Sequence, residues 1–293
     1  MYYVLIAILL LIILRLFVKR EGFSDIELID WWPAEKKSIE KDKQIFSKII
    51  KRPANVYSVM GNSNIKKDNL RIQYSGESTY RDITLFDINF IPTSKKEKNI
   101  VIFPQAYYHM LHNDIDINSL IKPRELNKKP DFCLFSVSNC NCEERNNFYK
   151  ELSKYKKIDS CGTCLNNTDK CPGNHEDPEY FKFIQKYKFM ICFENKSQPN
   201  YFTEKLINAY YGKTIPIYWG CSNVSDYINM NSILYLPQNF TKLDVKQLIE
   251  KIKFLDNDEF AYNEIYKEPL FKKIPDEFNI EKITEKVQLI LNS

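Results

Sequence analysis

The residues best placed to do chemistry lie in the segment 187–220. An apolar run ends at residue 193, and after a polar loop Thr203, Glu204 and Lys205 open a second apolar segment. Thr203 can cap the helix that this segment predicts, which places Glu204 and Lys205 in its first turn. The free N–H groups at the start of a helix attract anions, and Lys205 adds a positive charge. The segment therefore indicates a nucleotide diphosphate site; the alternative is an ordinary capped helix with a solvated Glu–Lys pair.

Cysteines in the middle of the chain offer a second kind of chemistry. Six of the eight cysteines lie between residues 133 and 171, with His175 close behind. A CxC at 140–142 followed by a CxxC at 161–164 does not have the spacing of a standard zinc finger. Three states remain open from the sequence: a structural zinc site, one or two disulfides, or free thiols. Disulfides would go with a lumenal body and free thiols with a cytoplasmic one.

Short apolar strands that alternate with helices surround these segments. The carboxyl-terminal half predicts strands at 132–137, 189–193, 215–219 and 233–236, and helices at 144–155, 203–211 and 243–254. This alternation is typical of βαβ units and parallel sheets, in which ligands bind outside the carboxyl ends of the strands. The sequence has no G-x-G-x-x-G that opens a helix and no P-loop, so a nicotinamide dehydrogenase or a P-loop kinase is not expected.

The amino-terminal half predicts a similar but less regular series of strands and helices. It predicts strands at 26–32, 55–60, 70–74 and 100–103, and a polar helix at 35–50. Residues 113–130 contain two prolines and many charges, which is typical of a linker. We therefore expect an α/β protein of two Rossmann-like domains, the first at residues 21–130 with its linker and the second at residues 131–293.

The first twenty residues differ from the rest of the chain. Residues 2–18 are apolar except for Arg15, and this length is at the low end of what crosses a bilayer. We expect an uncleaved transmembrane helix over residues 1–20 and a single-pass protein of the Golgi or another endomembrane. A cleaved signal peptide is the alternative, although no charged region precedes the run and no A-x-A site follows it.

The orientation of this anchor stays open. Positive charges flank the apolar run only on its carboxyl-terminal side, which favours a cytoplasmic body. Four N-x-S/T sequons would suit a lumenal body, although an Asn-rich chain produces such sequons by chance: Asn166, Asn195, Asn223 and Asn239.

Charge and composition exclude several classes of protein. The 42 Lys and Arg residues nearly balance the 38 Asp and Glu residues, so the chain lacks the basic bias of a nucleic-acid-binding protein. With 44% hydrophobic and 14% aromatic residues, the chain can form a packed core and is not of the disordered class.

The chemistry-bearing segments together resemble a known family. F-E-N at 193–195, Y-x-T-E-K at 201–205 and I-P-I-Y-W-G at 215–220 closely resemble the signature of the α1,3-fucosyltransferases, glycosyltransferase family 10. The segment 135–149, with Arg145, resembles that family's phosphate-binding strand and helix. The segment 74–87, with Glu77, resembles its catalytic-glutamate region. The resemblance runs from about residue 26 to about residue 275 and is strongest at 132–220.

The resemblance implies a fold, a donor and a reaction. The fold would be of the GT-B type, with two Rossmann-like domains facing a cleft. The donor would be GDP-fucose, and L-fucose would pass with inversion to an acceptor glycan, in α1,3 linkage to a GlcNAc-type sugar. No metal or other cofactor is required in this family. A catalytically silent GDP-sugar or glycan binder on the same fold is the alternative, and a zinc-dependent interaction module at 140–175 is a third hypothesis.

The resemblance also implies roles for single residues. Glu77 would be the general base, placed in the domain opposite the donor. Five other residues would bind the donor. Arg145 and Lys205 would bind the diphosphate, Glu204 the ribose, and Asn195 and Tyr201 other parts of the donor. A glycan on Asn195 would block this site, so the resemblance implies that its sequon is empty.

Overall fold

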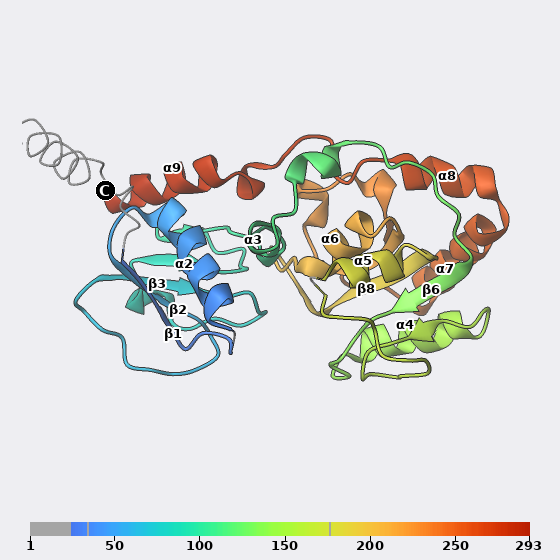
Figure 1. Ribbon diagram of the computed structural model, residues 1–293, viewed down its shortest axis with the longest axis horizontal. Coiled ribbons are helices and arrows are strands. Elements are labelled where there is room, and N and C mark those ends of the chain that lie inside the picture. Colours follow the sequence, from blue (N-terminus) through green and yellow to red (C-terminus); the bar gives the residue numbers. More distant parts are fainter. Residues whose placement is uncertain (1–24, 34, 176) are drawn as a thin grey trace, which may run out of the picture.

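The computed structural model describes residues 25–33, 35–175 and 177–293, and in them the chain forms two parallel β-sheets with helices packed against them (Figure 1). The first sheet belongs to the amino-terminal half and has the order β1-β2-β3-β4-β5. Its strands are β1 (Ile26–Ile29), β2 (Ala54–Tyr57), β3 (Leu70–Tyr74), β4 (Ile88–Phe90) and β5 (Ile100–Val101). Every residue of β2 and β4 is buried, as expected where both faces of a parallel sheet are covered.

The second sheet belongs to the carboxyl-terminal half and has the order β10-β9-β8-β6-β7. Its strands are β6 (Asp131–Phe135), β7 (Asp159–Ser160), β8 (Tyr187–Gln198), β9 (Ile215–Cys221) and β10 (Leu234–Tyr235). From β6 the chain first adds β7 on one side and then crosses to β8 on the other. The order therefore reverses between β6 and β8, which is where open α/β sheets of this topology bind ligands.

Eight α-helices of the described residues cover or join the sheets. They are α2 (Lys36–Ile50), α3 (Gln105–His112), α4 (Glu143–Ser153), α5 (Pro178–Ile184), α6 (Glu204–Tyr211), α7 (Lys242–Asn257), α8 (Glu259–Lys267) and α9 (Ile280–Leu291). The last helix, α9, returns to the amino-terminal half and lies beside α2 (Figure 1).

The two halves meet at α3 and the loop between β8 and α6. The Ala106 N–H donates to the Phe202 carbonyl at 2.9 Å, and His109 Nε2 lies 2.9 Å from Asn208 Oδ1 on α6. One cluster of buried apolar side chains runs from the first sheet through this junction to α6. The loop that follows β8 is therefore held from both sides.

The predicted strands and the helices α2, α4, α6 and α7 are observed, with shifts of a few residues at their ends. The middle of the expected linker at 113–130 packs against the rest of the protein. It contains a short 3₁₀ turn at Ile117–Ile121, and the buried Arg124 guanidinium lies 4.0 Å and 4.3 Å from the ring centres of Tyr210 and Tyr266. Composition marks this segment as polar, but it cannot show that the charge is stacked between two aromatic rings.

The expected membrane anchor at residues 1–20 lies outside the described residues. Within 25–33, 35–175 and 177–293, none of the helices combines the length and the apolar character that a bilayer crossing needs.

Candidate functional site

A pocket of about 140 Å³ opens where the strand order of the second sheet reverses. We call it the switch-point pocket. Its lining comes from the loop after β6, from β8, α4 and α6, and from His175 and Tyr180 before and within α5. Four of the six residues predicted for the site line it together: Arg145, Asn195, Glu204 and Lys205.

Arg145 is a buried cation at the back of this pocket. It lies in the first turn of α4 and has no exposed surface. Its Nη1 donates to the Phe193 carbonyl at 3.2 Å and to Asn195 Oδ1 at 2.9 Å, and its Nη2 donates to the Asn139 carbonyl. Burial lowers its pKa, but a guanidinium starts so far above neutrality that it stays charged. The loop after β6 is thus joined to β8 through one fixed positive charge.

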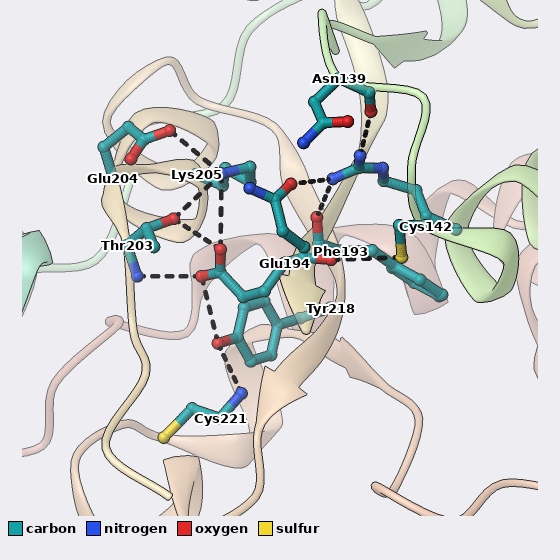
Figure 2. Close-up of polar contacts among 11 residues, drawn as sticks. Asn139, Cys142, Phe193, Glu194, Thr203, Glu204, Lys205, Tyr218 and Cys221 are labelled. Carbon is teal, nitrogen blue, oxygen red and sulfur yellow. Dashed lines mark hydrogen bonds and ion pairs between the residues drawn. The ribbon is translucent and has the colours of Figure 1, made fainter. Parts of the chain in front are cut away.

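Lys205 is the second cation, and three oxygens surround its ammonium (Figure 2). Its Nζ lies 3.2 Å from Thr203 Oγ1, 3.3 Å from Glu204 Oε1 and 3.4 Å from Glu194 Oε2. Burial would lower the pKa of Lys205, but the carboxylates of Glu204 and Glu194 outweigh burial and raise it. Lys205 is therefore protonated at neutral pH.

Glu204 is ionised beside it. Burial opposes its charged form, but Lys205 and then His109 outweigh that effect and lower the pKa of Glu204 to about 2. At neutral pH the pocket thus presents an ammonium and a guanidinium next to a carboxylate. That set can pair with a diphosphate and also accept hydrogen bonds from hydroxyl groups.

Glu77 lies outside the switch-point pocket, in the turn that follows β3 of the first sheet. The Ser75 hydroxyl accepts from the Glu77 N–H at 3.2 Å and donates to the Glu77 carbonyl at 3.0 Å, which fixes the turn. Burial raises the pKa of Glu77, while Lys205 lowers it and Glu204 raises it. The half-buried carboxyl therefore feels the charges of the pocket from the opposite half of the molecule.

Tyr201 does not line the switch-point pocket either. It is buried and lines a much smaller cavity, of about 10 Å³, together with Ser75 and Gly76. The structure thus places Tyr201 against the turn that carries Glu77.

The cysteines brace one wall of the pocket. Disulfides join Cys140 to Cys164 and Cys161 to Cys171, and Ser136 Oγ at the end of β6 lies 3.2 Å from Cys171 Sγ. The other four cysteines are buried thiols: Cys133, Cys142, Cys192 and Cys221. The part of the chain that the structure describes holds no cluster of three or more His, Cys, Asp or Glu side chains suited to a metal ion.

Glu194 is the residue of this site to which the sequence motifs assign no role. It follows the apolar run of β8 and is completely buried, and its carboxylate accepts from the Thr203 N–H at 2.9 Å and from the Thr203 hydroxyl at 2.6 Å (Figure 2). Its place in the F-E-N motif and its charge within a buried strand were the signals, but its role could not be assigned because its partners come from the following loop, from α6 and from β9.

Comparisons with known proteins agree on one family. Residues 126–284 match glycosyltransferase family 10 (fucosyltransferase), C-terminal part. A protein of Acanthamoeba polyphaga mimivirus that carries a fucosyltransferase name is 31% identical over 234 residues, which are 76% of this chain and 37% of that protein. The alpha-(1,3)-fucosyltransferase of Helicobacter pylori is 29% identical over 68% of this chain and 47% of its own length. The chain thus spans between about a third and a half of these relatives.

Solved structures share the fold. An alpha1,3-fucosyltransferase solved with GDP-fucose superposes with a TM-score of 0.73 at 23% identity, over 92% of this chain and 90% of the other. The same comparison with a GDP-bound structure gives a TM-score of 0.74. These likenesses establish an α/β fold with parallel sheets. The family match covers more than half of the sequence, and the chain therefore belongs to glycosyltransferase family 10, the fucosyltransferases.

Proposed function

We propose that the chain transfers L-fucose from GDP-fucose to a hydroxyl of an acceptor glycan. The observation that carries this proposal is the pair of fixed cations, Arg145 and Lys205, in a pocket at the strand-order reversal. A nucleoside diphosphate needs such charges, and the family supplies the identity of the sugar. At about 140 Å³ the pocket is smaller than the roughly 300–1,000 Å³ of most small-molecule sites, so it fits the diphosphate end of the donor.

The proposed reaction is a single inverting displacement. The acceptor oxygen attacks the anomeric carbon of fucose, the bond from that carbon to the diphosphate oxygen breaks, and the acceptor proton passes to Glu77. Negative charge then develops on the departing GDP, where Arg145 and Lys205 stabilise it. The two groups that must act on opposite sides of the sugar come from opposite halves of the molecule, which supports Glu77 as the base.

The remaining donor contacts are proposed from the family resemblance, and the surroundings of each residue support them. Glu204 is ionised and half-buried at its wall, which suits acceptance of ribose hydroxyl protons. Asn195 accepts a hydrogen bond from Arg145, and Tyr201 lines a small cavity together with Ser75 and Gly76 of the turn that carries Glu77. We propose Asn195 and Tyr201 as contacts to other parts of the donor.

We further propose a GT-B arrangement with an anchor at residues 1–20, a first domain at 21–130 and a second at 131–293. The two parallel sheets support the two domains. An endomembrane location with a lumenal body is supported by the two disulfides, because such bonds persist in oxidising compartments.

The acceptor is proposed as a GlcNAc-type sugar, as the family resemblance implies. The α1,3 linkage is supported by the Helicobacter pylori relative, which is named an alpha-(1,3)-fucosyltransferase. Other relatives are named GDP-fucose protein O-fucosyltransferase 3, among them the Xenopus laevis protein, which is 29% identical over 57% of this chain. A peptide hydroxyl is therefore the second candidate acceptor.

The test is an assay of the purified full chain with GDP-fucose, a panel of lactosamine-type glycans and folded protein acceptors, with and without EDTA. We expect fucosylated glycan, one GDP per transfer, inversion at the anomeric carbon and full rates in EDTA. Tight GDP binding without transfer to any acceptor would favour the silent binder instead. Activity that is lost in EDTA and restored by Mn²⁺ would contradict the metal-free mechanism.

A further inference from the structure

Glu194 has no role in the proposed reaction, although it is a carboxylate with no exposed surface. Burying an ionised group is costly unless charges and hydrogen bonds compensate it. Its two oxygens are therefore informative about what the site needs.

Every partner of this carboxylate belongs to the wall of the switch-point pocket or supports it. Oε1 accepts from the Thr203 N–H at 2.9 Å and lies 3.4 Å from the Tyr218 hydroxyl. Oε2 accepts from the Thr203 hydroxyl at 2.6 Å and lies 3.4 Å from Lys205 Nζ. Thr203 is the residue that precedes α6. Because Glu194 accepts hydrogen bonds from both the backbone N–H and the hydroxyl of Thr203, it fixes the start of that helix.

Gly220 on β9 leaves the space that Glu194 occupies. Its φ of +151° is rare for residues with a side chain, and a Cβ there would come within 2.3 Å of Glu194 Cγ. Tyr218 of the same strand accepts from the Cys221 N–H at 3.0 Å while its hydroxyl faces Glu194 (Figure 2). The side chain of Glu194, in F-E-N, can therefore occupy its position only because Gly220, at the end of I-P-I-Y-W-G, has no side chain.

We propose that Glu194 is a positioning residue of the donor site, which fixes the first turn of α6 and the Lys205 ammonium where they meet the diphosphate. This inference rests on the proposed function. Lys205 lines the pocket, and its ammonium also contacts Thr203 and Glu194, which lie outside the pocket lining. A preorganised cation stabilises developing charge without having to reorganise during the reaction, whereas a loosely held one must first be brought into place.

If Glu194 is a positioning residue, its substitution should affect turnover much more than GDP affinity. Glu194→Gln keeps the shape but removes a negative charge near the anion site, so simple electrostatics should strengthen GDP binding or leave it within about threefold. Turnover should fall ~10- to 100-fold, less than the about 10²–10³ that removal of a direct donor costs. A purely structural role would instead lower thermal stability and reduce only the amount of folded enzyme.

A double-mutant cycle tests whether Glu194 acts through Lys205. Turnover and GDP affinity are measured for wild type, Glu194→Gln, Lys205→Ala and the double variant, with folding checked by thermal melts. We expect Glu194→Gln to have less than about a threefold effect in the Lys205→Ala background, because coupled sites are not additive. Additive effects, or normal turnover of Glu194→Gln, would overturn the inference while leaving the proposed function intact.

The matched control is Asp256→Asn, which also changes a buried carboxylate to an amide. Asp256 pairs with Lys156 at 2.9 Å and Lys188 at 3.0 Å, at the amino-terminal end of β8, away from the pocket. It should lose stability with unchanged turnover per folded molecule. If the wild type transfers no fucose, the proposed function fails; if the wild type transfers fucose and the effects of the two changes on turnover are additive, only the inference on Glu194 fails.

Discussion

At the scale of single residues, the ammonium of Lys205 is shared among three oxygens before any ligand arrives. An incoming phosphate oxygen must replace one of them or join them. Of the three partners, Glu204 lines the pocket, whereas Glu194 and Thr203 do not. A ligand in the pocket can therefore contact Lys205 while Lys205 keeps its contacts with Glu194 and Thr203.

The two cations should therefore be needed separately. Lys205→Ala and Arg145→Ala should each lower kcat about 10²–10³-fold, because each removes one preorganised charge partner of the departing diphosphate. Arg145→Lys should fail as well, since a single ammonium cannot serve the three acceptors that the guanidinium joins.

Steady-state transfer rates check this, with Lys196→Ala as the control because Lys196 is an exposed neighbour on β8. The control should keep its activity. Rates within threefold of wild type for Lys205→Ala and Arg145→Ala would remove the donor-site assignment.

The charges of the pocket should also set the pH dependence. Burial raises the pKa of Glu77 above its ordinary 4.5, so the acid limb of kcat/KM should lie above that pH, where a base must lose its proton to act. Lys205 lowers and Glu204 raises the pKa of Glu77. Lys205→Ala should therefore move the limb to higher pH, and Glu204→Gln should move it to lower pH.

Rate profiles between pH 4 and 9 of the residual activities show these shifts. If the acid limb shifts in the same direction in Lys205→Ala and in Glu204→Gln, or shifts in neither variant, it belongs to a group other than Glu77.

At the scale of elements, the sequence predicts what depends on local pattern. The apolar runs of β6, β8 and β9 are local, so these strands could be placed from sequence alone. Thr203 does stand at the N-cap position of α6, but the predicted side-chain cap is wrong, because its hydroxyl donates to Glu194 instead. The motifs placed Arg145, Asn195, Glu204 and Lys205, which the structure brings together. Glu194 could not be recognised, because its partners are set by the packing of β9 and the path of the loop.

The helices α3, α5, α8 and α9 were not predicted. The tyrosines and histidines of α3 have weak helix propensity, and packing at the junction holds this helix. In α9, Ile283, Val287 and Ile290 do have helical spacing. The pairing of the cysteines likewise depends on loop geometry that spacing does not reveal.

The Cys140–Cys164 bond should stabilise the pocket wall. It closes a sequence separation of 24 residues, for which chain-entropy arguments give about 2–4 kcal/mol. Cys140 follows Asn139, whose carbonyl accepts from Arg145, so the double change Cys140→Ser/Cys164→Ser should also weaken GDP binding.

Urea denaturation and GDP titration measure the two effects, with the buried thiol change Cys133→Ser as a stability control on β6. Unchanged GDP affinity in the double variant would show that the wall keeps its position without the disulfide.

At the scale of the whole molecule, the carboxyl-terminal end completes the amino-terminal half. The helix α9 packs on α2, and its Ile283 and Val287 are completely buried in the core cluster that reaches both sheets. The relative placement of Glu77 and the switch-point pocket therefore depends on residues from both ends of the chain.

Ile283→Ala should lower the free energy of unfolding by about 2–5 kcal/mol, the cost of a large-to-small change in a packed core. Leu289→Ala on the same helix should change it by less than about 0.5 kcal/mol, because Leu289 is 73% exposed. Urea denaturation followed by tryptophan fluorescence reports on both sheets, through Trp31 and Trp32 beside the first and Trp219 on β9 of the second. Equal effects of the two changes would contradict this packing of α9.

In the proposed reaction, a base in one half of the molecule acts on a donor held in the other half. This is tested by comparing wild type and Glu77→Gln for GDP affinity by calorimetry and for fucose transfer to the best acceptor. Glu77→Gln should bind GDP as tightly as wild type and lose transfer about 10²–10⁴-fold, because the amide keeps the shape of the side chain but accepts no proton. Normal transfer by Glu77→Gln would show that Glu77 is not the base.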